Sequence, residues 1–176
     1  MRLRILRFIP AVLFLSLNSA LPMLAQAKLP ATETKSLSGK QVQVPVANRL
    51  TLLVTGFTKA SSDADGAWWK KAAPLCKQNP KLACFQVAVL EDAPRLIRPM
   101  IVGGMRHGMT AEQQETFLTS FENEKAWKQA LSYSAADNAY IALVDSSGAV
   151  LWVQNGGKQA GDLSGLARVL QERGGQ

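Results

Sequence analysis

Several features that would indicate a common enzyme class or a nucleic-acid-binding protein are missing from this 176-residue chain. Its only histidine, His107, lies far along the sequence from Ser61 and Ser62, whereas a serine hydrolase needs a base beside its nucleophile. Helix capping explains these two serines better. The 20 lysines and arginines form no basic run, which argues against nucleic acid as a partner. Without internal repeats or low-complexity tracts, one globular domain is expected.

The first 27 residues lack acidic side chains, and they lack an apolar run of the roughly 20 residues that a bilayer span requires. Arginines precede a short apolar stretch over residues 8–17, and Ala25-Gln26-Ala27 matches an A-x-A cleavage site. We therefore predict a signal peptide over residues 1–27, cleaved near Ala27, and a periplasmic or secreted protein. Retention of this segment as a membrane anchor is the alternative.

Cleavage would remove three arginines and no acid, so the formal charge would fall from +7 to +4. A mildly basic surface favours solubility, or weak attraction to anionic lipid or to an acidic partner. No cysteine borders the cleavage site, so no thiol is available there for a lipid anchor.

The mature chain divides into an arm and a domain. Residues 28–48 are polar and contain two prolines and a glycine, which predicts an N-terminal arm with one short strand over residues 41–44. The domain is expected over residues 49–176, where apolar periodicity becomes regular.

A β-α-β unit opens the domain. Residues 50–54 form a continuous apolar run, typical of a strand covered on both faces. Serine and aspartate caps at residues 61–65 predict a helix that ends before Asn79-Pro80, because the residue preceding a proline avoids the α region. A second strand is expected over residues 82–90.

The middle of the chain is predicted to be helical in pieces. Thr110 and Gln113 have the spacing of a capping box. The helix that begins there is expected to bury a stripe of Phe117, Leu118 and Phe121, and another short helix should follow it.

The last third predicts a hairpin and a helix. Residues 140–144 and 149–153 are apolar strands separated by a polar turn that contains Gly148. Asp162 is placed to cap a final helix whose apolar face includes Leu166. The expected order is β-α-β-α-β-β-α, with additional helix before the hairpin.

Four segments of the sequence resemble known families: LSGKQVQVP (37–45), LLVTGF (52–57), RPMIVGGMRHGM (98–109) and YIALVDSSGAVLWVQNGG (140–157). They resemble thioredoxin-like proteins related to the AhpC/TSA peroxiredoxins, and more closely the mitochondrial ATP-synthase assembly factor family and its bacterial relatives. The resemblance implies an α/β thioredoxin-like three-layer fold, with a central mixed sheet, a C-terminal β-hairpin and a final helix.

The same resemblance places a C-x-x-C motif near Ser61-Ser62-Asp63-Ala64, where this chain has no cysteine. A serine is not ionised at ambient pH and cannot form a disulfide, so the catalytic chemistry of the fold is not expected at this degenerate active-site loop. The cis-proline of thioredoxins would fall near Ala139, where a trans peptide bond is expected. We therefore expect neither an enzyme nor a bound cofactor.

Cys76 and Cys84 are the only cysteines. In an exported protein an even number favours a disulfide, although two buried thiols and a working redox pair remain alternatives. Because Cys76 shares a predicted helix face with Trp68 and Ala72, we expect it to be buried and inert.

Met105, His107 and Met109 offer thioether and imidazole groups that suit copper, but methionines of the core beside an exposed histidine are the simpler interpretation. Copper binding is therefore kept as a weak alternative.

Arg95, Arg98 and Arg106 alternate with apolar residues and predict a basic amphipathic surface. It is either a solvated helix face or a docking surface for membrane-protein loops or anionic headgroups. Of Trp68 and Trp69, one is expected in the core and the other, Trp69, as an exposed anchor.

These observations favour an exported, non-catalytic thioredoxin-fold protein that binds another protein, with assembly of a membrane complex implied by the resemblance. Membrane contact should be at most peripheral. The enzymatic alternative is a thiol-disulfide oxidoreductase or peroxidase-like protein that uses Cys76 and Cys84.

Overall fold

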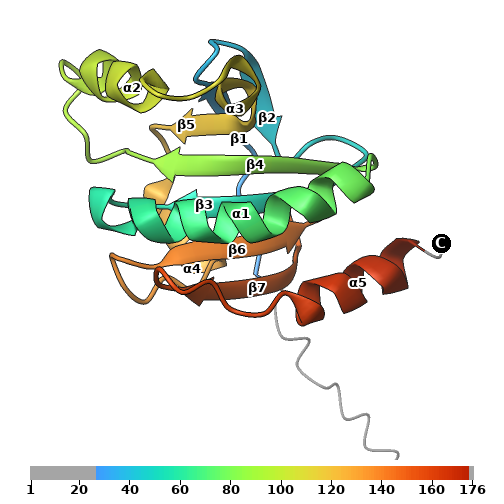
Figure 1. Ribbon diagram of the computed structural model, residues 1–176. Helices are drawn as coiled ribbons and strands as arrows, with labels where there is room; N and C mark the ends of the chain where they lie inside the picture. The colour runs from blue at the N-terminus through green and yellow to red at the C-terminus, as the bar shows by residue number, and fades with distance from the viewer. Residues whose placement is uncertain (1–26, 175–176) are drawn as a thin grey trace, which may run out of the picture.

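The computed structural model describes residues 27–174, so the predicted signal peptide lies almost entirely outside the described residues. A seven-stranded mixed sheet runs in the order β2-β1-β5-β4-β3-β6-β7 (Figure 1). The strands are β1 (Thr32–Ser36), β2 (Gln41–Val44), β3 (Leu50–Gly56), β4 (Leu82–Val89), β5 (Phe117–Ser120), β6 (Ala139–Val144) and β7 (Val150–Gly156). The helices are α1 (Ser62–Gln78), α2 (Arg98–Arg106), α3 (Ala111–Thr116), α4 (Glu124–Ala130) and α5 (Ser164–Gly174).

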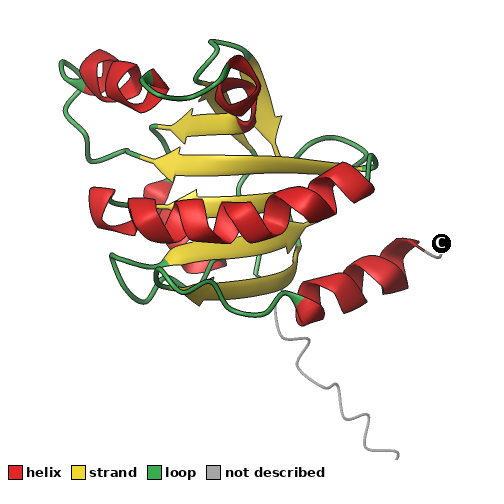
Figure 2. Cartoon of the chain, in the orientation of Figure 1, coloured by secondary structure: helices red, strands yellow, loops and turns green. Residues whose placement is uncertain are grey.

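Helices cover both faces of the sheet, which confirms the predicted three-layer α/β fold (Figure 2). On one face, Trp68 of α1 and Leu166 of α5 pack with Leu52 and Val54 of β3. On the other face, Trp127 of α4 packs in a second cluster that includes Leu53. No helix in the described range is long and apolar enough to cross a membrane.

The predicted β-α-β unit and hairpin are confirmed. β3 pairs parallel with β4 on one side and antiparallel with β6 on the other, and β6 pairs antiparallel with β7. Since side chains from both faces of β3 are buried, its sequence is continuously apolar instead of alternating. Asp162 accepts a hydrogen bond at Oδ1 from the Ser164 backbone amide, 3.1 Å away, where α5 begins.

Residues 32–44 form a β-hairpin, of which the sequence predicted only the second strand. β1 pairs antiparallel with both β2 and β5. Its inward positions are the hydroxyl residues Thr32, Thr34 and Ser36, all buried. Buried and exposed residues therefore alternate along β1 as in an ordinary strand. Because the buried residues are small and polar, the sequence shows no apolar pattern there.

The prediction of a helix that contains Phe117, Leu118 and Phe121 is wrong. The capping box of Thr110 and Gln113 is present, but α3 ends at Thr116 and the next residues form β5. The backbone of β5 pairs with β4 on one side and β1 on the other. These pairings, which only the tertiary fold supplies, override the helical spacing of the apolar residues.

The described structure predicts that Leu118 is a stability determinant, because its side chain is fully buried within a four-residue strand. Leu118→Ala should lower the free energy of unfolding by about 3 kcal/mol, through lost burial and the cavity left behind. Urea denaturation measures this change. Glu115→Ala, on the exposed side of α3, is the control and should change stability by less than about 0.5 kcal/mol. Equal effects of the two variants would contradict the assignment of β5 to the core.

Candidate functional site

The degenerate active-site loop lies at the N-terminus of α1, where its side chains bind other parts of the fold. Ser61 is buried, and its hydroxyl lies 2.9 Å from the Thr58 carbonyl oxygen and 3.0 Å from Oδ2 of Asp65. Ser62 donates a hydrogen bond to the Lys59 carbonyl. Asp63 forms an exposed ion pair with Lys158, and Ala64 is part of the core. No thiol and no free buried hydroxyl is presented here.

Asp65 is an unusual neighbour of Ser61, because most of its carboxyl is removed from water. Burial raises the pKa of Asp65 to about 7, and the hydrogen bond from Ser61 opposes this shift. Oδ1 is buried without a hydrogen-bond partner within the described structure. One serine hydroxyl has a single hydrogen, so it cannot donate fully to both Thr58 and Asp65. A protonated Asp65 removes this conflict by donating its own hydrogen to Ser61.

Gly56, at the end of β3, makes room for this carboxyl. A Cβ atom built on Gly56 would lie 2.0 Å from Oδ2 of Asp65 and 2.5 Å from the Ser61 hydroxyl oxygen. Both distances are far shorter than atomic contact, so any side chain at Gly56 would displace the pair. The glycine and the buried carboxyl therefore depend on one another.

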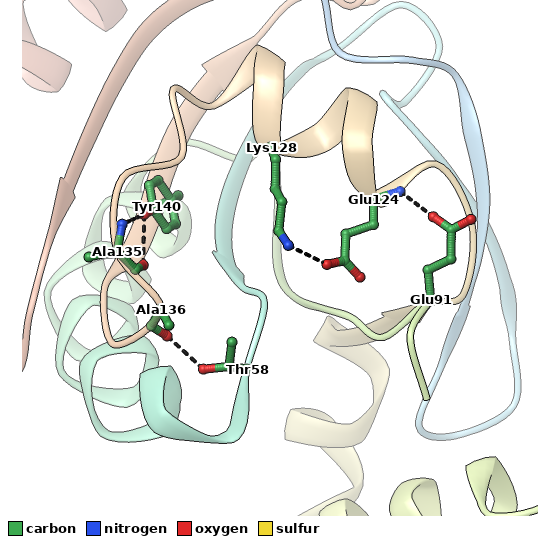
Figure 3. A network of polar contacts seen from close by, with 7 residues as sticks. All are labelled: Thr58, Glu91, Glu124, Lys128, Ala135, Ala136 and Tyr140. Carbon is green, nitrogen blue, oxygen red and sulfur yellow. Dashed lines mark hydrogen bonds and ion pairs between the residues drawn. The ribbon is translucent and has the colours of Figure 1, made fainter. Parts of the chain in front are cut away.

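The loop before β6 is hydrogen-bonded to Thr58, which lies just before the degenerate loop (Figure 3). The Thr58 hydroxyl donates a 2.6 Å hydrogen bond to the Ala136 carbonyl. The Tyr140 hydroxyl accepts hydrogen bonds from the amides of Ser134 and Ala135 and donates one to the Ala135 carbonyl. The peptide bond before Ala139 is trans, as expected, since the only cis bond in the described chain precedes Pro45. The two loops are thus fastened together.

Beside these loops lies a charged network that the sequence analysis missed. Lys128 is 2.5 Å from Oε1 of the buried Glu124, and Oε2 of Glu91 accepts a 2.6 Å hydrogen bond from the Glu124 amide (Figure 3). The Lys128 ammonium also lies over the rings of Phe57 and Tyr133. The hydrogen bond to Glu124 raises the pKa of Lys128, which keeps it charged. The i,i+4 spacing of Glu124 and Lys128 was the available signal.

Cys76 and Cys84 form a disulfide at the opposite end of α1, with their Cα atoms 6.1 Å apart. The expectation that Cys76 is buried is wrong, because both cysteines are half-buried and line a surface groove. Cys76 lies in the last turn of α1, where the helix dipole disfavours a thiolate. The bond is therefore accessible, but the helix does not activate it.

The groove between α1 and α3 has a volume of about 400 Å³. Trp69 lines it and is half-buried, whereas Trp68 is in the core and donates a 3.2 Å hydrogen bond to the Gly156 carbonyl. On the α3 side the groove is bordered by Thr110 and Gln113, whose side chains already serve the capping box. The groove offers apolar contact with Trp69 and the disulfide, and the charged side chains of Lys77 and Glu112 also line it.

The predicted basic surface is divided by the structure. Arg98 donates hydrogen bonds to the carbonyls of Ala93 and Glu91 and lies 4.6 Å from the centre of the Phe121 ring, so it holds the base of α2. Arg95 and Arg106 are exposed.

The residues of the copper hypothesis lie at the end of α2. His107 is exposed, and Met105 and Met109 are half-buried. Within residues 27–174, no cluster of three histidine, cysteine or acidic residues could hold a metal.

No family model and no curated protein matches the chain. Solved structures match most of it. The exposed lipoprotein thioredoxin of Streptococcus pneumoniae strain TIGR4 is 10% identical, with 81% of this chain and 99% of that chain covered and a TM-score of 0.58. BsSco, of the Sco family of cytochrome c oxidase assembly proteins, is 13% identical over 84% of this chain and 94% of its own, with a TM-score of 0.58.

A thiol peroxidase from Chromobacterium violaceum is also similar, at 12% identity, 86% and 88% coverage and a TM-score of 0.52. At such low identities the likeness shows the fold, and the chemistry of each site must be argued from its own residues. The chain therefore has the thioredoxin-like fold that its sequence predicted.

Replacement of Asp65 by asparagine should stabilise the protein in a pH-dependent way. The folded pKa of about 7 exceeds the ordinary value of 3.8, so between these pH values only the unfolded state loses its proton. Wild-type stability therefore falls as pH rises through this range and stays lowered above it. Asp65→Asn should gain up to about 4 kcal/mol near pH 8 and close to nothing near pH 4. Thermal unfolding at both pH values measures the difference, and an equal gain at both would contradict a buried, protonated carboxyl.

Proposed function

We propose that this protein is exported and non-catalytic, and that it acts by binding another protein. The observation that carries the proposal is the closed N-terminus of α1. Where the resemblance places a reactive cysteine there is the buried Ser61, hydrogen-bonded to Thr58 and Asp65. A helix N-terminus promotes catalysis in this fold by stabilising a thiolate, and here it has no thiol to act on.

The groove between α1 and α3 is the proposed docking site. Its volume of about 400 Å³ is large enough to receive a side chain or short segment of a partner. Half-buried tryptophans are effective anchors at protein interfaces, because they bury a large area with few rotatable bonds. We infer that the partner presents an apolar side chain to Trp69 and the disulfide.

The setting that we propose is assembly of a membrane complex outside the cytoplasm. Support comes from the predicted signal peptide and from the sequence resemblance to the ATP-synthase assembly factor family. The similar BsSco belongs to a family described as cytochrome c oxidase assembly proteins, so the fold is compatible with such a role.

Site-specific crosslinking in cells tests the docking site. A photoreactive amino acid at Ala73, which lines the groove, should give one discrete crosslinked protein. The same probe at the exposed Lys71 of α1, whose ammonium bonds to the Ala160 and Gly161 carbonyls and which does not line the groove, should not give it, and Trp69→Ala should abolish the product from position 73. A product of equal yield from both positions, or one that is insensitive to Trp69→Ala, would contradict docking in this groove.

Thiol-disulfide exchange is the second candidate function, because the Cys76–Cys84 disulfide is accessible in the groove. The two functions differ in what happens to the sulfur atoms. Under the binding function the disulfide is structural, so its state should not change when cells meet a mild reductant or a peroxide.

Acid quenching, alkylation and intact-mass measurement report the state of both cysteines. We expect one fixed mass, that of the bridged protein, before and after each challenge. Partial alkylation that rises with reductant and reverses with peroxide would instead favour the exchange function.

A further inference from the structure

The segment from Ala93 to Met109, called here the α2 protrusion, stands away from the rest of the fold. In Figure 1, α2 lies beyond the end of β4 and covers neither face of the sheet. No residue of α2 is buried, although the helix contains Met100, Ile101 and Val102. A helix of a globular protein ordinarily buries its apolar stripe against a core.

The exposed large hydrophobic residues of the described chain are all in this segment. Leu96 is 95% exposed, Met100 76% and Ile97 42%. Leu96 lies in the turn just before α2 and Met100 in the first turn of the helix, so the exposed apolar side chains are close together in the chain. Such a patch costs solubility unless something covers it.

The charged side chains within the protrusion are all positive. From Ala93 to Ala111 the sequence has no acidic residue, while Arg95 and Arg106 are exposed at the two ends of the protrusion. The nearest acids outside it are Glu91 and Asp92 on one side and Glu112 on the other. Oε2 of Glu91 is engaged by the Glu124 amide.

The base of the protrusion is fixed by Arg98. Its guanidinium bonds to the carbonyls of Ala93 and Glu91, at 2.9 and 3.0 Å, and stacks near Phe121. The segment that carries the apolar and basic side chains is therefore held in a defined conformation.

We propose that the α2 protrusion lies in the headgroup region of an anionic phospholipid bilayer. Leu96 and Met100 enter the boundary with the acyl chains, and Arg95 and Arg106 contact lipid phosphates. An acid-free segment that presents leucine and methionine together with two exposed arginines suits an anionic lipid surface, because the apolar side chains can insert while the cations pair with phosphate. A single short element gives weak, reversible and salt-sensitive binding.

This inference extends the proposed function, because it concerns where the protein is held and not what it binds in the groove. The two also fail independently, since the crosslinking experiment depends on Trp69 and Ala73 and the lipid experiment on Leu96 and Met100. Loss of one result leaves the other interpretable.

Vesicle flotation of the purified exported protein tests the proposal. The vesicles contain phosphatidylcholine alone or phosphatidylcholine with phosphatidylglycerol. We expect the wild-type protein to float with the anionic vesicles at low salt, and not with the neutral ones. Leu96→Glu with Met100→Glu should weaken binding about tenfold or more, since insertion and charge attraction are both lost. Leu96→Ser with Met100→Ser should also weaken it, through insertion alone.

The matched control is Gln41→Glu with Gln43→Glu, which adds the same two charges at exposed positions of β2 and should bind like the wild type. All variants share one N-terminus, so any difference between them reports the substituted residues. Circular dichroism confirms that each variant folds. Absence of wild-type binding to anionic vesicles would overturn the proposal and leave the patch to a protein partner. Equal binding by the wild type and the Leu96/Met100 variants would also overturn it.

Discussion

The burial of β3 on both faces is the constraint on which the rest of this structure depends. β3 lies between a parallel neighbour, β4, and an antiparallel one, β6, and its side chains divide between two apolar clusters. Because the strand has no solvent-facing side, a helix must cover each face, and α1 and α4 do so. The end of β3 is equally constrained, since Gly56 faces the first turns of α1 with no space for a side chain.

The two ends of α1 differ from the arrangement in which a helix N-terminus stabilises a thiolate. Its N-terminus, which stabilises negative charge, has a buried hydroxyl and a buried carboxyl instead of a thiol. Its sulfur is in the last turn, where the dipole has the opposite sign. The disulfide there ties the helix to β4 and forms part of a groove wall. The groove beside the disulfide is the surface that we propose for recognition of a partner.

The α2 protrusion and the groove are neighbours along the chain, because α3 follows α2 closely and borders the groove. If the protrusion is held at a membrane, a partner in the groove is recognised near that membrane. This arrangement fits the role that we propose in assembly of a membrane complex.

The sequence by itself determined the elements whose signals are local. The apolar run of β3, the capping box of α3, the turn between β6 and β7 and the break after α1 at Asn79 could all be predicted, because each depends on residues within a few positions. Tertiary structure alone decided the features that depend on distant partners. β5 is a strand because its backbone pairs with β4 and, across more than 80 residues, with β1.

The site depended on tertiary structure to a still greater extent. The raised pKa of Asp65 requires the space left by Gly56, and the role of Arg98 requires the ring of Phe121. The exposure of the Cys76–Cys84 disulfide depends on how far α3 lies from α1. Sequence spacing reports which residues share an element, whereas burial and charge depend on which elements meet.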